Sequence, residues 1–144
     1  MTAIARRRLL LIPLALASIL ALSGAAHAAP SAARHVVFQV SEANPQSWNL
    51  TLNNAHNVQA QLGPQARIEI VAYGPGIRML KLESPVAARI AEALGDHVQV
   101  NACQATMKAQ QLTQADMLPG IGYVPSGVVE LMKKQSEGYA YIRP

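Results

Sequence analysis

Short apolar runs rich in β-branched residues recur along the chain, and segments with apolar residues at helical spacing separate them. Runs of this kind are typical of strands, whereas apolar residues at every third or fourth position indicate helices with one buried face. The alternation therefore predicts strands that are joined by helices. The expected strands cover residues 34–40, 67–72, 97–102, 121–124 and 139–142.

Proline and glycine mark where the expected helices begin and end. Asn44-Pro45 supplies an N-cap residue and a proline at the first helical position, and Gly63-Pro64 stops the same helix. Ser84-Pro85 repeats the starting signal, and Gly95 follows as a stop. The expected helices cover residues 45–62, 85–94, 104–112 and 128–135, and the apolar segment 77–82 is expected to be partly helical.

Strands separated by helices of this length need crossover connections, which are right-handed and join parallel strands. The sequence therefore predicts one α/β domain, with a mainly parallel sheet of about five strands and helices on both faces. This is the three-layer arrangement of flavodoxin-like folds. The last strand is expected at an edge of the sheet, and the domain is expected to span residues 29–144.

The first 28 residues have the features of a secretory signal peptide rather than of a folded element. Arg6-Arg7-Arg8 is a basic region, Leu9–Leu22 is a 14-residue apolar run, and Ala26-His27-Ala28 is a small-x-small cleavage site. We expect cleavage before Ala29 and export to the periplasm, with no stable membrane span afterwards. An uncleaved membrane anchor is the alternative, although the apolar run is short for one.

The basic charge of the chain lies largely in this leader. Of the 12 Lys and Arg residues, three belong to Arg6–Arg8, and the remaining nine nearly balance the eight Asp and Glu residues. Clusters of Lys or Arg with interleaved aromatic residues are absent from the sequence. The composition therefore gives no support to nucleic-acid binding.

Cys103 is the only cysteine, and it lies where an expected strand runs into a helix start. A thiol at the positive end of a helix favours the thiolate form. In an oxidising compartment structural cysteines come in pairs, so a single one indicates intermolecular pairing or a reactive thiol. The alternative is that Cys103 is a small buried apolar residue. The sequence has no CxxC motif and no cysteine–histidine pair with metal-ligand spacing.

Residues that follow the carboxyl ends of parallel strands meet at one edge of a sheet, where ligands bind in α/β folds. Four loops are expected to meet at this edge, and Cys103 is the candidate reactive group among them. The candidate crevice around it consists of Glu42, Asn44, Tyr73, Gly74, Pro75, Gly76, Arg78 and Thr106, with Pro125-Ser126 nearby.

Histidine is not expected to act as a base for Cys103. His35 and His97 begin their strands, which places them at the opposite edge, and His56 lies in the middle of the first expected helix. A general base must lie within hydrogen-bond reach of its nucleophile, so a cysteine–histidine hydrolase is not favoured. The GxSxG, GxGxxG and Walker-type motifs are absent, and no cofactor is expected.

Functional and structural interpretations remain open for several of these residues. Gly74-Pro75-Gly76 indicates a sharp turn or a close approach of the backbone, but a plain connecting loop needs no ligand. Arg78 is the nearest cation that could stabilise a thiolate. Glu42 could orient a ligand or only interact with the following helix start.

Three separated motifs resemble the DsrE/DsrF-like family. Val98-Gln99-Val100 leading to Cys103-Gln104-Ala105-Thr106-Met107 is similar to its cysteine motif, and Ile70–Gly76 is similar to its strand and Gly-Pro-Gly loop. The ending from Gly127 to Pro144 resembles exported members of the family. The resemblance covers nearly all of the chain after the leader.

The resemblance implies an α/β domain that forms homo-oligomers, often trimers or hexamers. It also implies that Cys103 takes up sulfane sulfur as a persulfide and passes it between partner proteins. Two departures are visible. Many relatives have histidine before Gly-Pro-Gly where this chain has Tyr73, and the sulfur relays of the family operate inside cells.

Two functions of different classes follow. The first is a periplasmic sulfur-handling protein whose Cys103 reversibly carries a persulfide, which requires an accessible thiolate and a partner surface. The second is a binding or assembly module in which the crevice from Tyr73 to Gly76 holds a small molecule or protein segment and Cys103 only packs. A turnover enzyme is less favoured, because the sequence offers no assignable acid–base pair.

Overall fold

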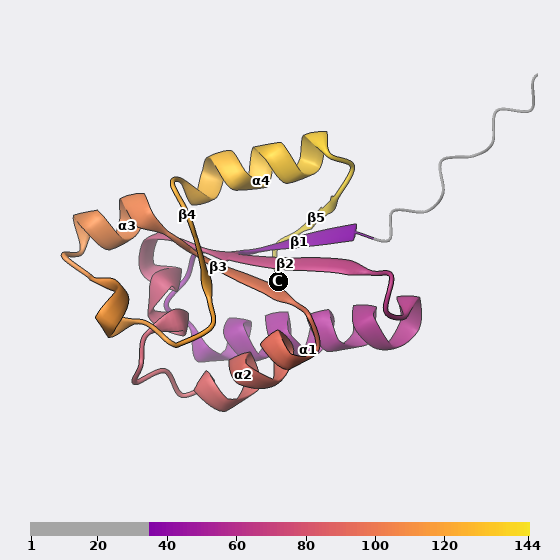
Figure 1. The fold of residues 1–144 in the computed structure, drawn as a ribbon, viewed down its shortest axis with the longest axis horizontal. Coiled ribbons are helices and arrows are strands. Elements are labelled where there is room, and N and C mark those ends of the chain that lie inside the picture. The colour runs from indigo at the N-terminus through magenta and orange to yellow at the C-terminus, as the bar shows by residue number, and fades with distance from the viewer. Residues whose placement is uncertain (1–34) are drawn as a thin grey trace, which may run out of the picture.

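The computed structural model describes residues 35–144 (Figure 1). The expected signal peptide lies outside the described residues. The strands are β1 (His35–Val40), β2 (Arg67–Ala72), β3 (Gln99–Cys103), β4 (Gly122–Val124) and β5 (Ala140–Ile142). The helices are α1 (Pro45–Leu62), α2 (Ala87–Gly95), α3 (Gln104–Ala109) and α4 (Gly127–Ser136), with 3₁₀ turns η1 (Gly74–Leu80) and η2 (Gln114–Asp116).

All five strands form one parallel sheet in the order β4-β3-β2-β1-β5. The predicted single α/β domain with helices on both faces is therefore confirmed, and the last strand lies at an edge as expected. Helices α1 and α2 lie below the sheet in Figure 1, and α4 lies above it. Among the described residues, no helix is both long enough and apolar enough to cross a membrane.

The two faces of the sheet are packed very differently. Phe38, Ile70 and Val100 point to the α1–α2 side and join a cluster of 21 buried residues with Trp48 and Ile90. The α4 side has a cluster of four buried residues, which are Val37, Val71, Val124 and Leu131. Burial of apolar area is the main source of stability, so the α1–α2 side carries most of the core.

A buried ion pair supplements the small cluster under α4. Glu69 of β2 is only 1% exposed, and its Oε2 lies 3.3 Å from Nζ of Lys134 on α4. Burial opposes the charge of Lys134, but Glu69, Tyr139 and Glu137 together outweigh it and raise the pKa of Lys134. The helix is thus tied to the middle of the sheet by a charge pair as well as by Leu131.

Two helix boundaries differ from those expected by two residues or more. Helix α2 begins at Ala87 rather than at Pro85, because Ser84 first forms a turn in which its carbonyl accepts the Ala87 N–H. Helix α3 ends at Ala109 rather than at Leu112, and Gln111, which follows the C-cap residue Gln110, adopts a positive φ of 56°. Neither change alters the order of the strands.

The Gly-Pro-Gly loop packs tightly against its own chain. A Cβ on Gly76 would lie 2.4 Å from the carbonyl oxygen of Val40, at the end of β1. Gly74 has a φ of 53°, a conformation that favours glycine. The close backbone approach expected from the sequence is therefore an approach to β1, and it needs no ligand.

We expect Gly76→Ala to lower the free energy of unfolding by about 1–3 kcal/mol, because backbone atoms must shift to admit the methyl group. Gly95→Ala is the matched control, since a Cβ there meets nothing within 4 Å and no positive φ is needed. Its effect should be smaller than about 1 kcal/mol. Urea denaturation of both variants measures the difference, and equal effects would contradict the steric account.

Candidate functional site

Cys103 ends β3 and is the N-cap residue of α3. Its Sγ accepts a hydrogen bond from the backbone N–H of Thr106 at 3.5 Å, as an N-cap side chain does. The Ala105 N–H and the Thr106 hydroxyl also act on the sulfur. The strand-to-helix junction therefore surrounds the thiol with hydrogen-bond donors from the first turn of one helix.

A second helix start contributes another donor. The backbone N–H of Gly127, the first residue of α4, also lowers the pKa of Cys103. A Cβ on Gly127 would lie 2.9 Å from both Cβ and Cδ1 of Tyr73, so only glycine fits here without a shift. Since orphan N–H groups at helix starts carry partial positive charge, both helices favour a negative charge on Sγ.

The ionisation of Cys103 is a balance of opposing effects. Burial is the largest influence and disfavours the thiolate, but the hydrogen bonds from Thr106, Gly127 and Ala105 together outweigh it. The pKa of Cys103 is therefore lowered from its usual value. Cys103 is only 4% exposed, so the thiolate is stabilised by protein donors with little help from water.

Thr106 links the cysteine to the Gly-Pro-Gly loop. The backbone N–H of Gly74 donates to Oγ1 of Thr106 at 2.9 Å, which leaves the hydroxyl hydrogen for Cys103. Nε2 of Gln110, one turn further along, donates to the Gly74 carbonyl at 3.2 Å. The loop after β2 and the helix after β3 therefore hold one another in register.

Tyr73 faces the same crevice from the end of β2. Burial raises the pKa of its phenol above the usual value, and Tyr141 and Cys103 act in the same direction. Arg143 and a hydrogen bond with Ser41 oppose this increase. The phenol therefore keeps its proton at neutral pH.

Among the other predicted residues, Glu42 forms an ion pair with Arg143, and its carbonyl accepts the Trp48 indole N–H at 2.7 Å. Asn44 caps α1 by accepting the Gln46 N–H. Arg78 is exposed in η1, and the groups that lower the pKa of Cys103 are hydrogen-bond donors rather than this guanidinium. The structure thus brings Tyr73, Gly74 and Thr106 to Cys103, pairs Glu42 with Arg143, and uses Asn44 as the cap of α1.

Sequence reasoning missed four residues of this edge: Ser41, Gly127, Tyr141 and Arg143. Strand β5 runs parallel beside β1, so its carboxyl end brings Tyr141 and Arg143 to the crevice. One signal for Gly127 is present in the sequence: it directly follows Pro125-Ser126, a segment that was expected at this edge.

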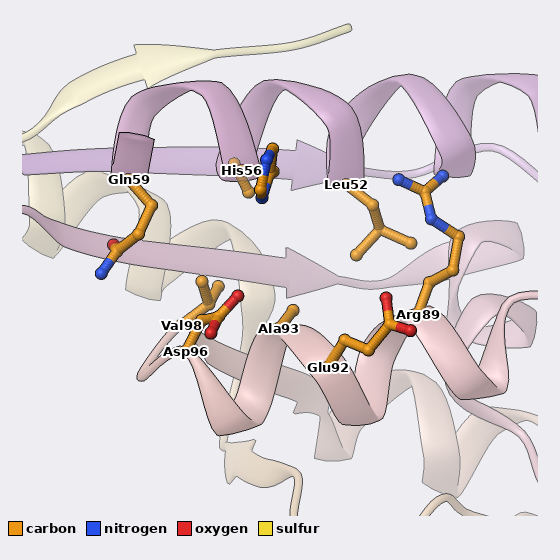
Figure 2. Close-up of a pocket in the computed structure, with 9 residues that line it drawn as sticks. Leu52, His56, Gln59, Arg89, Glu92, Ala93, Asp96 and Val98 are labelled. Carbon is orange, nitrogen blue, oxygen red and sulfur yellow. The ribbon is translucent and has the colours of Figure 1, made fainter. Parts of the chain in front are cut away.

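A separate pocket of about 70 Å³ lies between α1 and α2 (Figure 2). Leu52 and Ala93 form apolar parts of its lining, and Glu92 and Asp96 extend their carboxylates from α2. It lies on the opposite face of the sheet from Cys103 and contains no nucleophilic thiol. Within residues 35–144, no group of three or more His, Cys, Asp or Glu side chains is placed to hold a metal ion.

Comparison with known proteins gives one family match. The model of the DsrE/DsrF-like family matches residues 16–144. No curated protein matches the sequence.

Several solved structures share the fold. A protein of unknown function from Methanobacterium thermoautotrophicum, MTH1491, is 36% identical, with a TM-score of 0.73 over 76% of this chain and 98% of its own. A conserved protein of unknown function from Bacteroides thetaiotaomicron, BT1422, is 16% identical, with a TM-score of 0.62 over 81% of this chain and 99% of its own. The ychN protein of E. coli is 13% identical, with a TM-score of 0.61 over 76% and 98%. The last two similarities concern the fold alone.

We expect Thr106→Val to raise the pKa of Cys103, because the variant loses the hydroxyl that donates to the sulfur. A hydrogen bond to a charged group contributes about 1.5–3 kcal/mol, so alkylation near neutral pH should slow roughly tenfold or more. Thr106→Ser is the matched control and should keep the wild-type pH profile. Alkylation quenched at successive times and analysed by mass spectrometry gives the reaction rate at each pH. Identical pH profiles of alkylation for Thr106→Val and Thr106→Ser would contradict the role assigned to the Thr106 hydroxyl.

Proposed function

The chain belongs to the DsrE/DsrF-like family, and we propose that it is a sulfur-handling protein in which Cys103 carries a persulfide. The observation that carries this proposal is the set of N–H and O–H donors that converge on Sγ and lower the pKa of Cys103. A thiolate is the form that attacks sulfane sulfur.

The transfer step is a thiol–persulfide exchange that needs no outside oxidant. The Cys103 thiolate attacks the outer sulfur of a donor persulfide, R–S–SH, and a new Sγ–S bond forms. The S–S bond of the donor breaks, and its electron pair leaves with the inner sulfur as the thiolate R–S⁻. Delivery to an acceptor thiolate is the same exchange in reverse, and Cys103 is returned as a thiolate.

Tyr73 has a defined part in this proposal. Its phenol keeps its proton and hydrogen-bonds with Ser41, so Tyr73 places a neutral group at the crevice where many relatives have histidine. It cannot act as a base at neutral pH, because its pKa is raised. This favours a carrier, which binds and releases sulfur, over an enzyme that must move protons in each turnover.

The burial of Cys103 supports a second candidate function. A thiol that is 4% exposed resembles a core cysteine, and in that case the crevice is a binding or assembly site without covalent chemistry. The two functions differ in thiol accessibility. A carrier must react in its native state with a small reagent, whereas a packed thiol reacts only after unfolding.

The expected location is part of the proposal. We propose that residues 1–28 direct the chain to the periplasm and are removed before Ala29, as the basic, apolar and small-x-small segments indicate. Cys103 is the single cysteine in the sequence, so it lacks an intramolecular thiol partner in an oxidising compartment. Its sulfur must then come from, and go to, another molecule.

Incubation of the protein comprising residues 29–144 with inorganic polysulfide should add about 32 Da, the mass of one sulfur atom on the thiol. Cys103→Ser should gain no mass, and dithiothreitol should remove the adduct from the wild type. Intact-mass spectrometry under native conditions measures all three. A wild type that stays unmodified until it is denatured would contradict the carrier function and favour the binding module.

A homo-oligomer is also proposed, and an apolar surface supports it. Val128, Val129 and Met132 on α4 are exposed, as are Tyr141 and Ile142 on the edge strand β5. Helix α4 and β5 contact each other, and Tyr141 pairs with Val37 on the α4 face of the sheet, so Tyr141 adjoins the exposed side of α4, while Ile142 lies on the same edge strand. Clusters of exposed apolar residues of this kind mark protein interfaces.

We expect Val129→Asp combined with Met132→Asp to reduce the molecular mass in solution to that of one chain, because charges would be buried in the interface. Leu62→Asp at the end of α1 is the control, since Leu62 is similarly exposed but lies outside this surface. Light scattering coupled to size exclusion measures the mass. A wild type that is monomeric, or a control that dissociates equally, would contradict the assignment.

A further inference from the structure

A row of polar side chains crosses the carboxyl end of the sheet on the face that α4 covers. Side chains alternate along a strand, and Val37 and Val71 belong to the cluster under α4. Gln39 and Tyr73 follow them by two residues and therefore emerge on the same face. Tyr141 on β5 does so as well, because it pairs with Val37. The strands β5, β1 and β2, which carry this row, lie side by side in that order (Figure 1).

Hydrogen bonds join the row from the edge strand inwards. The phenol of Tyr141 donates to Oε1 of Gln39 at 2.6 Å. Nε2 of Gln39 donates to Oγ of Ser41 at 3.1 Å. Ser41 in turn hydrogen-bonds with the phenol of Tyr73. Four side chains thus form one chain of hydrogen bonds from β5 to the crevice at Cys103.

The backbone keeps the last link of this chain together. The Tyr73 N–H donates to the Val40 carbonyl at 3.0 Å, which fixes the residue after β2 beside the last residue of β1. Ser41 directly follows Val40. The Ser41 hydroxyl and the Tyr73 phenol therefore stay within reach of each other.

The ring of Tyr73 lies against the start of α4. A Cβ on Gly127 would lie 2.9 Å from Cδ1 and 3.1 Å from Cγ of Tyr73, so the ring fills the space beside this glycine. The Gly127 N–H is one of the donors that favour the Cys103 thiolate. Hydrogen bonds weaken steeply as their geometry departs from the optimum. The position of the ring therefore bears on how well Gly127 serves the sulfur.

We propose that Tyr141 is a positioning residue of the Cys103 site. It acts through Gln39 and Ser41, whose hydrogen bonds hold the Tyr73 ring against the start of α4. The proposal rests on the function proposed for Cys103, because a positioning role matters only where the thiol reacts. It extends that function to the edge strand β5, which contributes no group to the sulfur itself.

The charged and titratable groups around Tyr73 leave this role to the hydrogen bonds. Cys103 and Tyr141 act on the phenol in one direction, and Arg143 acts in the other. The Arg143 guanidinium is paired with Glu42. The hydrogen-bond partner of the phenol is Ser41, so a neutral chain of hydrogen bonds rather than an ion pair holds it.

Tyr141→Phe removes the first hydrogen bond of the chain and keeps the ring. Tyr141 is 41% exposed, so the change opens no cavity in the core. The acid dissociation constant of Cys103 should fall about threefold, as expected for loss of one neutral hydrogen bond that aligns the donors. Ultraviolet absorbance of the thiolate measures the constant, with the matching Cys103→Ser protein subtracted for each variant.

Tyr139→Phe is the matched control. Tyr139 directly precedes β5, and its ring packs against His35, with Nζ of Lys134 5.0 Å from the ring centroid. Its hydroxyl is not part of the chain of hydrogen bonds. The ionisation of Cys103 should therefore remain that of the wild type.

Ser41→Ala tests whether the hydrogen bonds act as one chain. It breaks the link between Gln39 and Tyr73, so it should lower the acid dissociation constant at least as much as Tyr141→Phe does. Tyr141→Phe should then have no further effect in a protein that already carries Ser41→Ala, whereas independent contributions would add.

The proposal is overturned if Tyr141→Phe leaves the ionisation of Cys103 unchanged, if Tyr139→Phe shifts it equally, or if the effects of Tyr141→Phe and Ser41→Ala add. Urea denaturation of each variant separates positioning from stability, and shifts that merely follow the loss of stability would also overturn it. The absorbance measurement needs neither a sulfur donor nor access to the thiol. A wild type that polysulfide fails to modify would contradict the sulfur carrier alone, so the two failures are distinguishable.

Discussion

A buried thiolate is stable only where hydrogen-bond donors of the protein replace the water it has lost. This requirement governs the structure around Cys103, at the carboxyl edge of the sheet. Two helix starts must reach the same sulfur. Helix α3 does so because Cys103 is its own N-cap residue, and α4 does so because Gly127 lacks a side chain. Donors from both helices contribute to the lowered pKa of Cys103.

The packing of the sheet explains what keeps them there. Helix α3 is tied to the Gly-Pro-Gly loop through Thr106 and Gly74, and that loop is pressed against the end of β1 by the close contact of Gly76. Helix α4 rests on a small apolar cluster, so the buried pair of Glu69 and Lys134 is a large part of its attachment. Breaking a buried ion pair leaves an uncompensated charge and is strongly destabilising, which couples the middle of the sheet to the Cys103 site.

Much of the fold could be predicted from the sequence, because local signals and tertiary packing agree in it. The β-branched runs and the Asn44-Pro45 start mark true elements, and the expected parallel sheet and family are confirmed. The start of α2 was placed too early, because Ser84 uses its cap signal in a turn. Thr106 and Tyr73 were placed near Cys103 because strand polarity alone determines which loops share an edge. Gly127, Tyr141 and Arg143 depend on which strand lies beside which, and the burial of Cys103 depends on how those loops pack. Periodicity carries neither kind of information.

The proposed persulfide carrier depends most directly on the ionisation of Cys103 in the folded protein. Ultraviolet absorbance of the thiolate can be titrated against pH for the native protein and for the same protein in denaturant, with Cys103→Ser subtracted to remove the tyrosine signal. The native thiol is expected to ionise at a lower pH than the denatured one, since the hydrogen-bond donors outweigh burial. A native thiol that ionises at the same pH as the denatured one, or at a higher pH, would show that burial prevails and would contradict the proposed sulfur carrier.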